Sequence, residues 1–570
     1  MDCPDACSLE VRVDNGRVAA IRGSTDHPTT AGFICDKIAG FHKRVYHEDR
    51  LLHPLRRRGP KGSGDFERIG WDEAIAVIAE RLRAIRERWG GEAIVPYHYG
   101  GSNGYLSDGL VDAALFARLG ASRLGRTLCA APSGAVASGM YGKMPGVAFE
   151  DYPEARCIFI WGANPKASNI HLVPFLKEAR RRGAFIAAID PRNVFSAGEI
   201  DLHLPVFPGT DLPVALSMIR LWSEAGRLDE ESLRGRAAGW DRLLEQAGRW
   251  PVERAAAVAR VDPADIRRLA EIYAASSPAL LRVGWGLERN RNGGQAIAAI
   301  LAMPALLGKF GVRGGGYTLS NSGAARLDSQ RLIGSITWTT RELNMTRLGH
   351  WLGDPDLAPP VRGLFVYNCN PAATAPEQNR VLAGLRREEI FTVVHDQVMT
   401  DTALLADVVL PATTFLEHHD IARGYGAYVV GGVRPVIAAA GEAKPNDEVF
   451  ALLGRALGLD DAVFHSDSAT LARRTAEAIE MPGGRRPDSA VLEAGRVERF
   501  DFPGERPVQF LTVLPRTRDG KADLLPACLG RAPYEYREGA SLPGEAAPPG
   551  GVPMPAGPSS YPLALITPAS

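Results

Sequence analysis

Short apolar stretches that alternate with a helical pattern are the feature that most constrains this chain. Residues 157–162 and 184–190 are almost entirely apolar, and the first ends in glycine, the second in aspartate. Residues 171–182, between them, have helical spacing and a basic end. Strands that are apolar on both faces and joined by a helix are typical of a parallel sheet. We therefore predict an α/β unit in this part of the chain.

The same pattern returns nearer the C-terminus. Residues 363–368, 390–396 and 407–411 read as strands, and residues 379–387 read as a helix. Polar residues follow the strands in both units, at the sheet edge where ligands bind in open α/β folds. Two such units indicate either two related ligands, or one ligand site and one structural copy.

The N-terminal segment has a different pattern. Residues 8–13 and 18–23 alternate around Asn15-Gly16, which predicts a β-hairpin. Residues 71–82 have helical spacing with an acidic first turn. Residues 482–562 are rich in proline, glycine and alanine, which predicts connecting and irregular structure.

Three of the seven cysteines, Cys3, Cys7 and Cys35, are clustered near the N-terminus. Seven is an odd number and the spacing is uneven, so a disulfide framework is not expected. Clustered thiolates suit a metal centre, and iron–sulfur clusters are usually held by four of them. The alternative is three buried structural cysteines.

Composition narrows the class of protein. Lys+Arg and Asp+Glu number 66 each, and no long run of like charge provides a surface for nucleic acid or an anionic membrane. There is no apolar run of 18 residues and no signal-peptide pattern at Met1. We therefore expect no nucleic-acid partner, no membrane insertion and a cytoplasmic location. A periplasmic location would require an upstream twin-arginine segment.

The cysteine segment resembles the opening of a known family. Residues 3–9 and 32–37 are similar to the start of the molybdopterin oxidoreductases, the group of formate dehydrogenases, periplasmic nitrate reductases, thiosulfate and polysulfide reductases and dimethyl sulfoxide reductase. In the cluster-bearing members this segment ligates a [4Fe-4S] cluster through four cysteines. The last three match here, and the first would fall just before Met1, so we expect either an N-terminally shortened chain or a misplaced start. The resemblance also implies that Lys37 lies between cluster and pterin.

The resemblance gives Cys129 a role that its surroundings alone do not. A single cysteine among small residues is otherwise most often a buried core thiol. In the family this position supplies the protein ligand to molybdenum, and a thiolate is a strong donor to such a metal. Ser133 is the alternative, since the dimethyl sulfoxide reductase branch uses serine nearby. Formate dehydrogenases place histidine directly after the ligand, whereas Ala130 stands here, which weakens a formate assignment.

The resemblance to this family also implies a binding site for a bis(molybdopterin guanine dinucleotide) cofactor. A pyrophosphate needs backbone N–H groups, and a guanine edge needs a carboxylate partner such as Asp190. The expected contacts in the first unit, with the glycine loop that follows it, are Trp161, Gly162, Asn164, Pro165, Asp190, Arg192, Gly209, Asp211, Gly284 and Gly286. Those in the second unit are Asn368, Asn370, Pro371, Asp396, Thr400 and Asp401.

Residues 417–420 place one glutamate, two histidines and one aspartate in a row. Such a row occurs in divalent metal sites. The family has a plain glutamate there, so we expect no additional metal.

The expected fold is α/β and multidomain: a small β-rich iron–sulfur module, two doubly wound α/β dinucleotide-binding domains, and the start of a C-terminal β-barrel. The module is expected in residues 1–55, and the first dinucleotide domain in residues 131–324. The second is discontinuous, in residues 56–130 and 325–480, and residues 481–570 hold the connector and barrel. Residues 561–568 resemble the first barrel strand, which predicts a barrel cut short and weakened retention of the cofactor.

The resemblance implies an enzyme that exchanges two electrons or an oxygen atom with a small-molecule substrate. Its electrons would pass through the cluster to an electron-transfer partner protein or subunit. The alternatives are a non-redox hydratase-type member, and a scaffold subunit without the cofactor. Retention of Cys129, Asp190, Asp211 and Asp396 argues against the scaffold.

Overall fold

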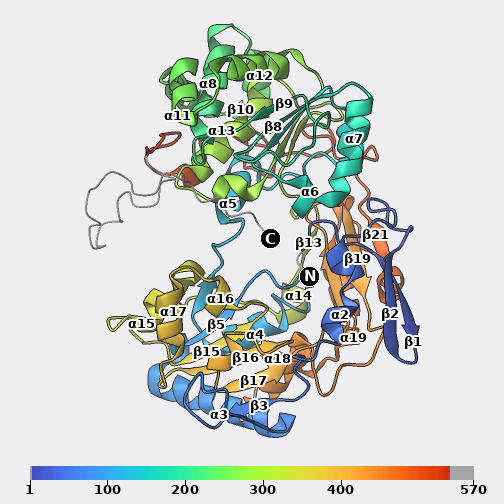
Figure 1. Ribbon diagram of the computed structural model, residues 1–570, viewed down its shortest axis with the longest axis vertical. Helices are drawn as coiled ribbons and strands as arrows, with labels where there is room; N and C mark the ends of the chain where they lie inside the picture. Colours follow the sequence, from blue (N-terminus) through green and yellow to red (C-terminus); the bar gives the residue numbers. More distant parts are fainter. Residues whose placement is uncertain (1–2, 539–570) are drawn as a thin grey trace. The chain divides into compact units, whose positions relative to one another are not determined.

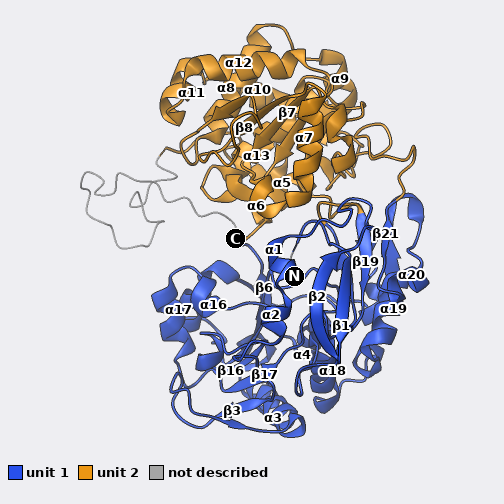
Figure 2. Ribbon diagram, turned by 45° about the vertical axis from the view of Figure 1, so that its right-hand side comes forward, with its two compact units in different colours: residues 1–128, 325–424, 429–500 blue, residues 129–324, 425–428, 501–570 orange. Residues whose placement is uncertain are grey.

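The computed structural model describes residues 3–538, and the chain divides into two compact units. Unit 1 contains residues 1–128, 325–424 and 429–500 (Figure 2). Unit 2 contains residues 129–324 and 425–428, and begins again at residue 501. Unit 2 is thus inserted into the sequence of unit 1.

Unit 2 is built on a parallel sheet of five strands, which confirms the prediction for this region. Strands β7 and β8 are the predicted ones, and β7 is buried along its whole length, as expected for a strand covered on both faces. The sheet order is β12 (Gly316–Thr318), β11 (Ala279–Val283), β7 (Cys157–Trp161), β8 (Phe185–Ile189), β9 (Leu202–Leu204).

The order of these strands places a topological switch point inside the sheet. The chain enters at β7, continues outward through β8 and β9, and then returns to the other side of β7 with β11 and β12. The chain therefore continues from β7 and from β11 in opposite directions across the sheet, toward β8 and toward β12. A crevice at such a point is the usual ligand position in open α/β sheets.

Helices cover this sheet, and one group of them was not anticipated from the sequence. Helix α7 is the predicted crossover between β7 and β8. Helices α10, α11 and α12 pack around α8, which buries most of its residues; in this layer Trp222 Nε1 donates to the Ala270 carbonyl at 2.8 Å. The unit 2 helices are α5 (Ala131–Tyr141), α6 (Pro165–Ser168), α7 (Val173–Arg181), α8 (Asp211–Glu224), α9 (Glu230–Arg236), α10 (Trp240–Gly248), α11 (Val252–Ala259), α12 (Pro263–Ala275) and α13 (Gly293–Leu306).

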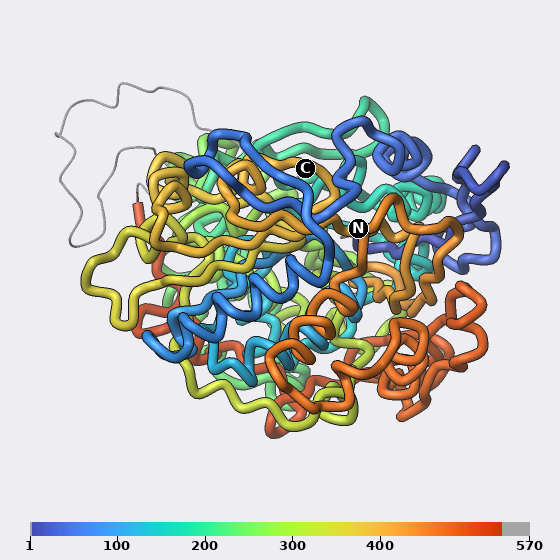
Figure 3. The backbone as a smooth tube through the Cα atoms, turned by 90° about the horizontal axis from the view of Figure 1, so that it is seen from below, coloured from blue at the N-terminus to red at the C-terminus, as the bar shows by residue number. Residues whose placement is uncertain are grey.

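Unit 1 is built on a six-stranded mixed sheet, and the three strands predicted in its C-terminal part are confirmed. Four strands are parallel and follow one another across the sheet in chain order, and two short antiparallel strands extend one edge. The order is β4 (Phe66–Arg68), β3 (Leu55–Arg57), β17 (Val408–Pro411), β16 (Phe391–Asp396), β15 (Gly363–Tyr367), β5 (Ile94–His98). Segments far apart in sequence, blue and yellow to orange, thus lie side by side (Figures 1 and 3).

The N-terminal hairpin is confirmed as β1 (Leu9–Asp14) and β2 (Arg17–Gly23). The predicted helix from Trp71 is also present, extended to Trp89. The unit 1 helices are α1 (Asp36–Ala39), α2 (His42–Val45), α3 (Trp71–Trp89), α4 (Val111–Leu119), α14 (Gln330–Ile333), α15 (Leu348–Gly353), α16 (Pro371–Thr374), α17 (Gln378–Leu385), α18 (Asn446–Ala456), α19 (Ser468–Ala478) and α20 (Ser489–Glu493).

Several small sheets complete the units. An antiparallel sheet of β18 (Asp420–Arg423), β19 (Val429–Val433) and β21 (Val497–Arg499) was not anticipated. Two-stranded pairs are formed by β6 (Arg123–Gly125) with β14 (Glu342–Asn344), β13 (Arg326–Leu327) with β20 (Ile479–Glu480), and β10 (Ala237–Ala238) with β22 (Ala522–Asp523).

Residues 482–538 contain only short elements, in agreement with the predicted irregular structure. The barrel strand expected at residues 561–568 lies outside the described residues. In the described part of the chain no helix is long and apolar enough to cross a membrane.

Candidate functional site

The switch point of unit 2 brings together two glycine-containing loops, one after β7 and one after β11. Gly284 N donates to the Trp161 carbonyl at 2.8 Å, and Gly286 N donates to the Gly162 carbonyl at 3.0 Å. A Cβ on Gly284 would clash with the Gly162 carbonyl, and one on Gly286 would lie 2.7 Å from it. Gly162 also has φ +61°, a conformation that favours glycine. Three of the expected cofactor residues therefore form one tight loop pair.

Two side chains at this loop pair carry polar atoms that are buried without a partner. Asn164, the N-cap of α6, has a buried Oδ1 with no hydrogen bond from any described residue. The Oε2 atom of Glu288 is in the same state. Glu288 ends the short 3₁₀ turn η4 (Trp285–Glu288) after β11. Because an unsatisfied buried acceptor is costly, these atoms indicate a place for a hydrogen-bonding ligand or water.

The other oxygen of Glu288 binds the first turn of α5. Its Oε1 accepts from the Ser133 backbone N–H at 3.3 Å and from the Ser133 hydroxyl. Burial raises the pKa of Glu288 to about 7, against the opposing hydrogen bonds from Ser133. Cys129 lies just before this helix and is partly exposed, whereas Ser133 is buried and engaged by Glu288. The Ser133 side chain is thus occupied by Glu288.

Three other expected cofactor contacts of unit 2 lie at the ends of β7 and β8 or beside them. The Trp161 indole is buried and donates to Asp211 Oδ1 at 2.8 Å, so these two side chains satisfy each other. Burial raises the pKa of Asp211 to about 6, and the nearby Asp190 carboxylate adds to the shift. Asp190 ends β8 and accepts from the Arg192 backbone N–H at 2.9 Å, while burial raises its pKa.

Two further expected cofactor contacts of unit 2, Gly209 and Pro165, lie at positions where the backbone conformation suits the residue. Gly209 has φ +86°, and its carbonyl accepts from Asn292 Nδ2 at 3.2 Å. Pro165 is the first residue of α6, a position that needs no N–H donor.

The corresponding loop in unit 1 is internally hydrogen-bonded. Asn370 Oδ1 accepts from the Thr402 hydroxyl at 2.6 Å and from its N–H at 3.2 Å, and Asn370 Nδ2 donates to Asp401 at 3.3 Å. Asn368, with φ +57°, donates to the Ser107 carbonyl at 3.0 Å and accepts from Asn446. Pro371 is the first residue of α16, as Pro165 is of α6.

The next strand of unit 1 places the other predicted contacts at the same sheet edge. Asp396 ends β16 and accepts from the Gln397 N–H at 2.6 Å, and burial raises its pKa. Thr400 accepts from the Ala403 N–H at 3.2 Å and starts the turn that leads to Asp401.

The three N-terminal cysteines lie close enough to influence one another. Burial raises the pKa of Cys3 to about 11 and that of Cys7 to about 12, and the Cys35 thiolate adds to both shifts. The N–H groups of Asp5 and Ala6 counteract this by pointing at the Cys3 sulfur. Three converging thiols with N–H donors form a donor set suited to an iron–sulfur cluster. Lys37 lies on the exposed side of α1.

The Glu417 to Asp420 row is divided between two networks. Glu417 pairs with the buried Arg50 at 2.7 Å. Asp420 accepts from the Ser107 hydroxyl at 2.6 Å and from the Leu106 N–H at 2.8 Å. Both carboxylates are thus occupied by protein donors.

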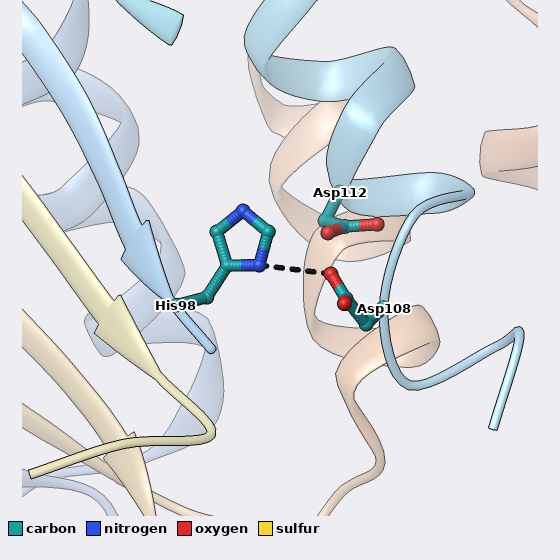
Figure 4. Close-up of side chains that lie close together, drawn as sticks. All are labelled: His98, Asp108 and Asp112. Atoms are coloured by element: carbon teal, nitrogen blue, oxygen red, sulfur yellow. Dashed lines mark ion pairs between the residues drawn. The ribbon is translucent and has the colours of Figure 1, made fainter. Parts of the chain in front are cut away.

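One group was missed by the sequence analysis: His98, Asp108 and Asp112 in unit 1 (Figure 4). His98 ends β5, Asp108 lies in the following loop, and Asp112 is in the first turn of α4. His98 Nδ1 lies 2.8 Å from Asp108 Oδ1, and Arg126 contacts Asp108 Oδ2 at 2.6 Å. A histidine at a strand's carboxyl end, followed by two aspartates at i and i+4, is the signal that marks it.

The electrostatics of this group differ between its two carboxylates. Burial opposes ionisation of Asp108, but His98 and Arg126 outweigh it and lower the pKa of Asp108. Burial raises the pKa of Asp112, and the Asp108 charge raises it further.

Comparison with known proteins assigns the chain to a family. The family described as "Molybdopterin oxidoreductase" matches residues 50–456, and "Molybdopterin oxidoreductase Fe4S4 domain" matches residues 2–47. The chain is 35% identical over 516 residues to the "Probable oxidoreductase YoaE" of Bacillus subtilis (strain 168), covering 89% of this chain and 75% of that protein. It is 27% identical to the "Assimilatory nitrate reductase catalytic subunit" of the same organism, covering 83% and 69%.

Among solved structures, acetylene hydratase from Pelobacter acetylenicus has a similar fold. The TM-score is 0.76 at 24% identity, covering 93% of this chain and 78% of that chain. This supports the mixed α/β, multidomain architecture. The chain belongs to the molybdopterin oxidoreductase family, whose matched domains imply an enzyme with a molybdopterin cofactor and an Fe4S4 cluster.

Proposed function

We propose that this chain is a molybdenum oxidoreductase that uses a bis(molybdopterin guanine dinucleotide) cofactor. It exchanges two electrons or an oxygen atom with a small-molecule substrate. Cys3, Cys7 and Cys35 would hold part of a [4Fe-4S] cluster, which would supply single-electron transfer to a partner protein or subunit. Cys129 is the proposed protein ligand to molybdenum.

The observation that carries the proposal is the switch point of unit 2. Two loops meet there so closely that no side chain fits at Gly284, and Asn164 and Glu288 leave buried acceptors unsatisfied. A polar ligand with several N–H and O–H groups, such as a pterin, would satisfy both acceptors. The residues present therefore fit the group that the family implies.

The chain's own residues supply binding and orientation. In unit 2, the proposed contacts are the loops at Gly162 to Pro165 and at Gly284 to Gly286, with Asp190 and Arg192 at the end of β8. Gly209 and Asp211 support that end of the sheet. In unit 1, the proposed contacts are Asn368, Asn370, Pro371, Asp396, Thr400 and Asp401.

When bound, the cofactor supplies the two-electron chemistry at its metal, while the protein determines what reaches it. The N–H groups of Asp5 and Ala6 at the Cys3 sulfur would stabilise negative charge on that thiolate. We propose that Lys37, close to Cys35 in sequence, adds positive charge beside the cluster.

Electron paramagnetic resonance of the dithionite-reduced protein tests the proposal. We expect a molybdenum(V) signal together with a cluster signal. A cluster signal with no molybdenum in the protein would contradict it and indicate a scaffold subunit. Bound metal that stays silent through turnover would favour a hydratase-type activity, the second candidate, because acetylene hydratase shares this fold.

A further inference from the structure

We propose that His98, Asp108 and Asp112 form a site for a first-row divalent transition-metal ion in unit 1, separate from the proposed molybdenum ligand. This site does not depend on the proposed function. It lies at the carboxyl edge of the unit 1 sheet, where β5 ends and α4 begins (Figure 4). Its three residues each offer one ligand atom, and these atoms lie within 4.8 Å of one another.

The geometry of the first two ligands matches a coordination sphere. Metal–nitrogen and metal–oxygen bonds are about 2.0 to 2.2 Å long, so neighbouring ligand atoms lie about 3 Å apart. His98 Nδ1 and Asp108 Oδ1 are already 2.8 Å apart. Both atoms are shielded from solvent, and they form an ion pair with each other. We propose that a metal ion binds here by displacing the proton that His98 and Asp108 share, because a histidine must be neutral to act as a metal ligand.

Each carboxylate is hydrogen-bonded by neighbouring protein groups, as metal-ligating carboxylates usually are. Arg126 binds Asp108 through Oδ2 at 2.6 Å and leaves Oδ1 facing His98. Asp112 accepts from the Tyr367 hydroxyl at 2.7 Å and from the Gly109 N–H at 2.8 Å. The His98 ring stacks on Tyr367 with centroids 4.6 Å apart and an interplanar angle of 8°. These contacts fix all three side chains before a metal arrives.

Charge balance favours a cation at this point. With the His98 ring neutral, as a metal ligand must be, two ionised carboxylates and the Arg126 guanidinium leave a net negative charge where Asp112 is only 3% exposed. A buried, uncompensated charge is expensive, so a further positive charge is needed there. The side chains of His98 and Asp108 are 14% and 19% exposed, which gives an ion a path of entry.

The ligand set identifies the class of ion. Calcium and magnesium are bound by oxygen donors, whereas imidazole selects zinc, iron, nickel and copper. One imidazole with two carboxylates suits zinc or its spectroscopic substitute, cobalt(II). Three protein ligands also leave a coordination position open to water or substrate.

Cobalt(II) binding to the purified full chain, after removal of metals with a chelator, tests the site. Cobalt reports its own ligands, because thiolates give intense charge-transfer absorption and nitrogen or oxygen donors give only weak bands. We expect about one cobalt per chain with the weak bands, in addition to any bound at cysteines. His98→Gln and Asp108→Asn should each lose that equivalent.

The matched control is His350→Gln. His350 is also a unit 1 histidine beside a carboxylate, 2.6 Å from Glu377, but it belongs to no group of three metal-ligating residues among those described. It should bind cobalt like the wild type, and thermal denaturation should show the same stabilisation by cobalt.

Three results would overturn the proposal. They are no weak-band cobalt in the wild type, binding only with thiolate absorption, and equal weak-band binding by the wild type and both variants. Any of these would mean that the group is an internally balanced network of His98, Asp108 and Arg126. If one variant fails to fold, the other still decides the question.

Discussion

The loop after β7 in unit 2 and the loop after β15 in unit 1 have the same local design in different surroundings. Asn164 and Asn370 each precede a proline at the first residue of a short helix, and their backbone angles are close, −114° and 86° against −123° and 77°. Asn370 is fully engaged by Thr402 and Asp401, while Asn164 keeps a buried oxygen without a partner.

The topology around the two loops explains the difference. The strand order of unit 2 reverses at β7, and Asn164 follows this strand, at the usual ligand position of an open α/β sheet. In unit 1 the four parallel strands follow one another in chain order from β5 to β17, and the neighbouring loop folds onto Asn370. Two matching sequence motifs therefore do not make two equivalent sites, and the strand order distinguishes them.

The largest expected difference is between Cys129 and Cys369. Cys129→Ala removes the proposed molybdenum ligand of unit 2 and should abolish turnover with the cluster absorbance intact. Cys369→Ala should retain most of its turnover, because that thiol is engaged within unit 1, 3.5 Å from the Tyr97 carbonyl. Steady-state assays and visible spectra of both variants check this. Undiminished turnover in Cys129→Ala would contradict the ligand assignment.

The next effect concerns the loop contact at the unit 2 switch point. Gly284→Ala forces a methyl group against the Gly162 carbonyl and should cost about 3 kcal/mol of unfolding free energy. It should also lower the molybdenum content. Gly294→Ala in α13 meets open space and should instead be neutral or stabilising by about 0.5 kcal/mol. Urea denaturation measures the unfolding free energy of both variants, and metal analysis measures their molybdenum content. Equal effects of the two substitutions would contradict the close contact between Gly284 and the Gly162 carbonyl.

A smaller effect depends on pH. Because the pKa of Glu288 is raised to about 7 in the folded chain, its proton is bound more tightly there than in the unfolded chain. Stability from this group is present at low pH and is lost as the pH rises through 7. Glu288→Gln should therefore be about 2 kcal/mol more stable than the wild type at pH 8, and about equal to it at pH 4.

Asp461 in unit 1 should change stability with pH in the opposite direction. Its hydrogen bond from Arg118 lowers its pKa, so Asp461→Asn should be slightly less stable than the wild type at pH 7, with the difference disappearing in acid. Denaturation midpoints across the pH range measure both. Two curves of the same sign would refute the electrostatic argument.

The smallest predicted effect compares the two asparagines directly. Asn370→Ala leaves the buried Thr402 donors without a partner and should cost about 1 kcal/mol. Asn164→Ala removes an acceptor that has no protein partner and should change stability by less than about 0.5 kcal/mol, while reducing cofactor retention. Reversed rankings would show that unit 1, not unit 2, has the unsatisfied loop.

The sequence predicts the strands of both sheets well, because their apolar runs are unambiguous. Residues 157–162 and 363–368 correspond to β7 and β15 within one residue. The layer around α8 was not anticipated, although its helical spacing is readable. Strand β21 pairs with β19 across more than 60 positions, and such pairing leaves no local signal.

Site residues were predicted by motif, and motif does not reveal how a side chain is engaged. Nothing in the sequence shows that Trp161 and Asp211 satisfy each other, or that Glu288 binds the first turn of α5. His98 and Asp108 escaped notice because ten positions separate them, and the i, i+4 spacing of Asp108 and Asp112 does not by itself point to His98. The two residues come together because β5 ends at His98, next to the loop that carries Asp108.

The insertion of unit 2 into unit 1 has a consequence for synthesis of the chain on the ribosome. Strands β3 and β5 are made early, but β15, β16 and β17, which lie between them in the sheet, begin only at Gly363. At roughly 5 to 20 residues per second, the early strands wait on the order of half a minute with their edges unpaired. All five strands of the unit 2 sheet emerge within that interval. The unit 2 sheet is therefore positioned to form before the unit 1 sheet, and the segment that begins at Asp501 completes unit 2 later. Until β15 to β17 are made, the early strands of unit 1 expose edges that a chaperone would protect.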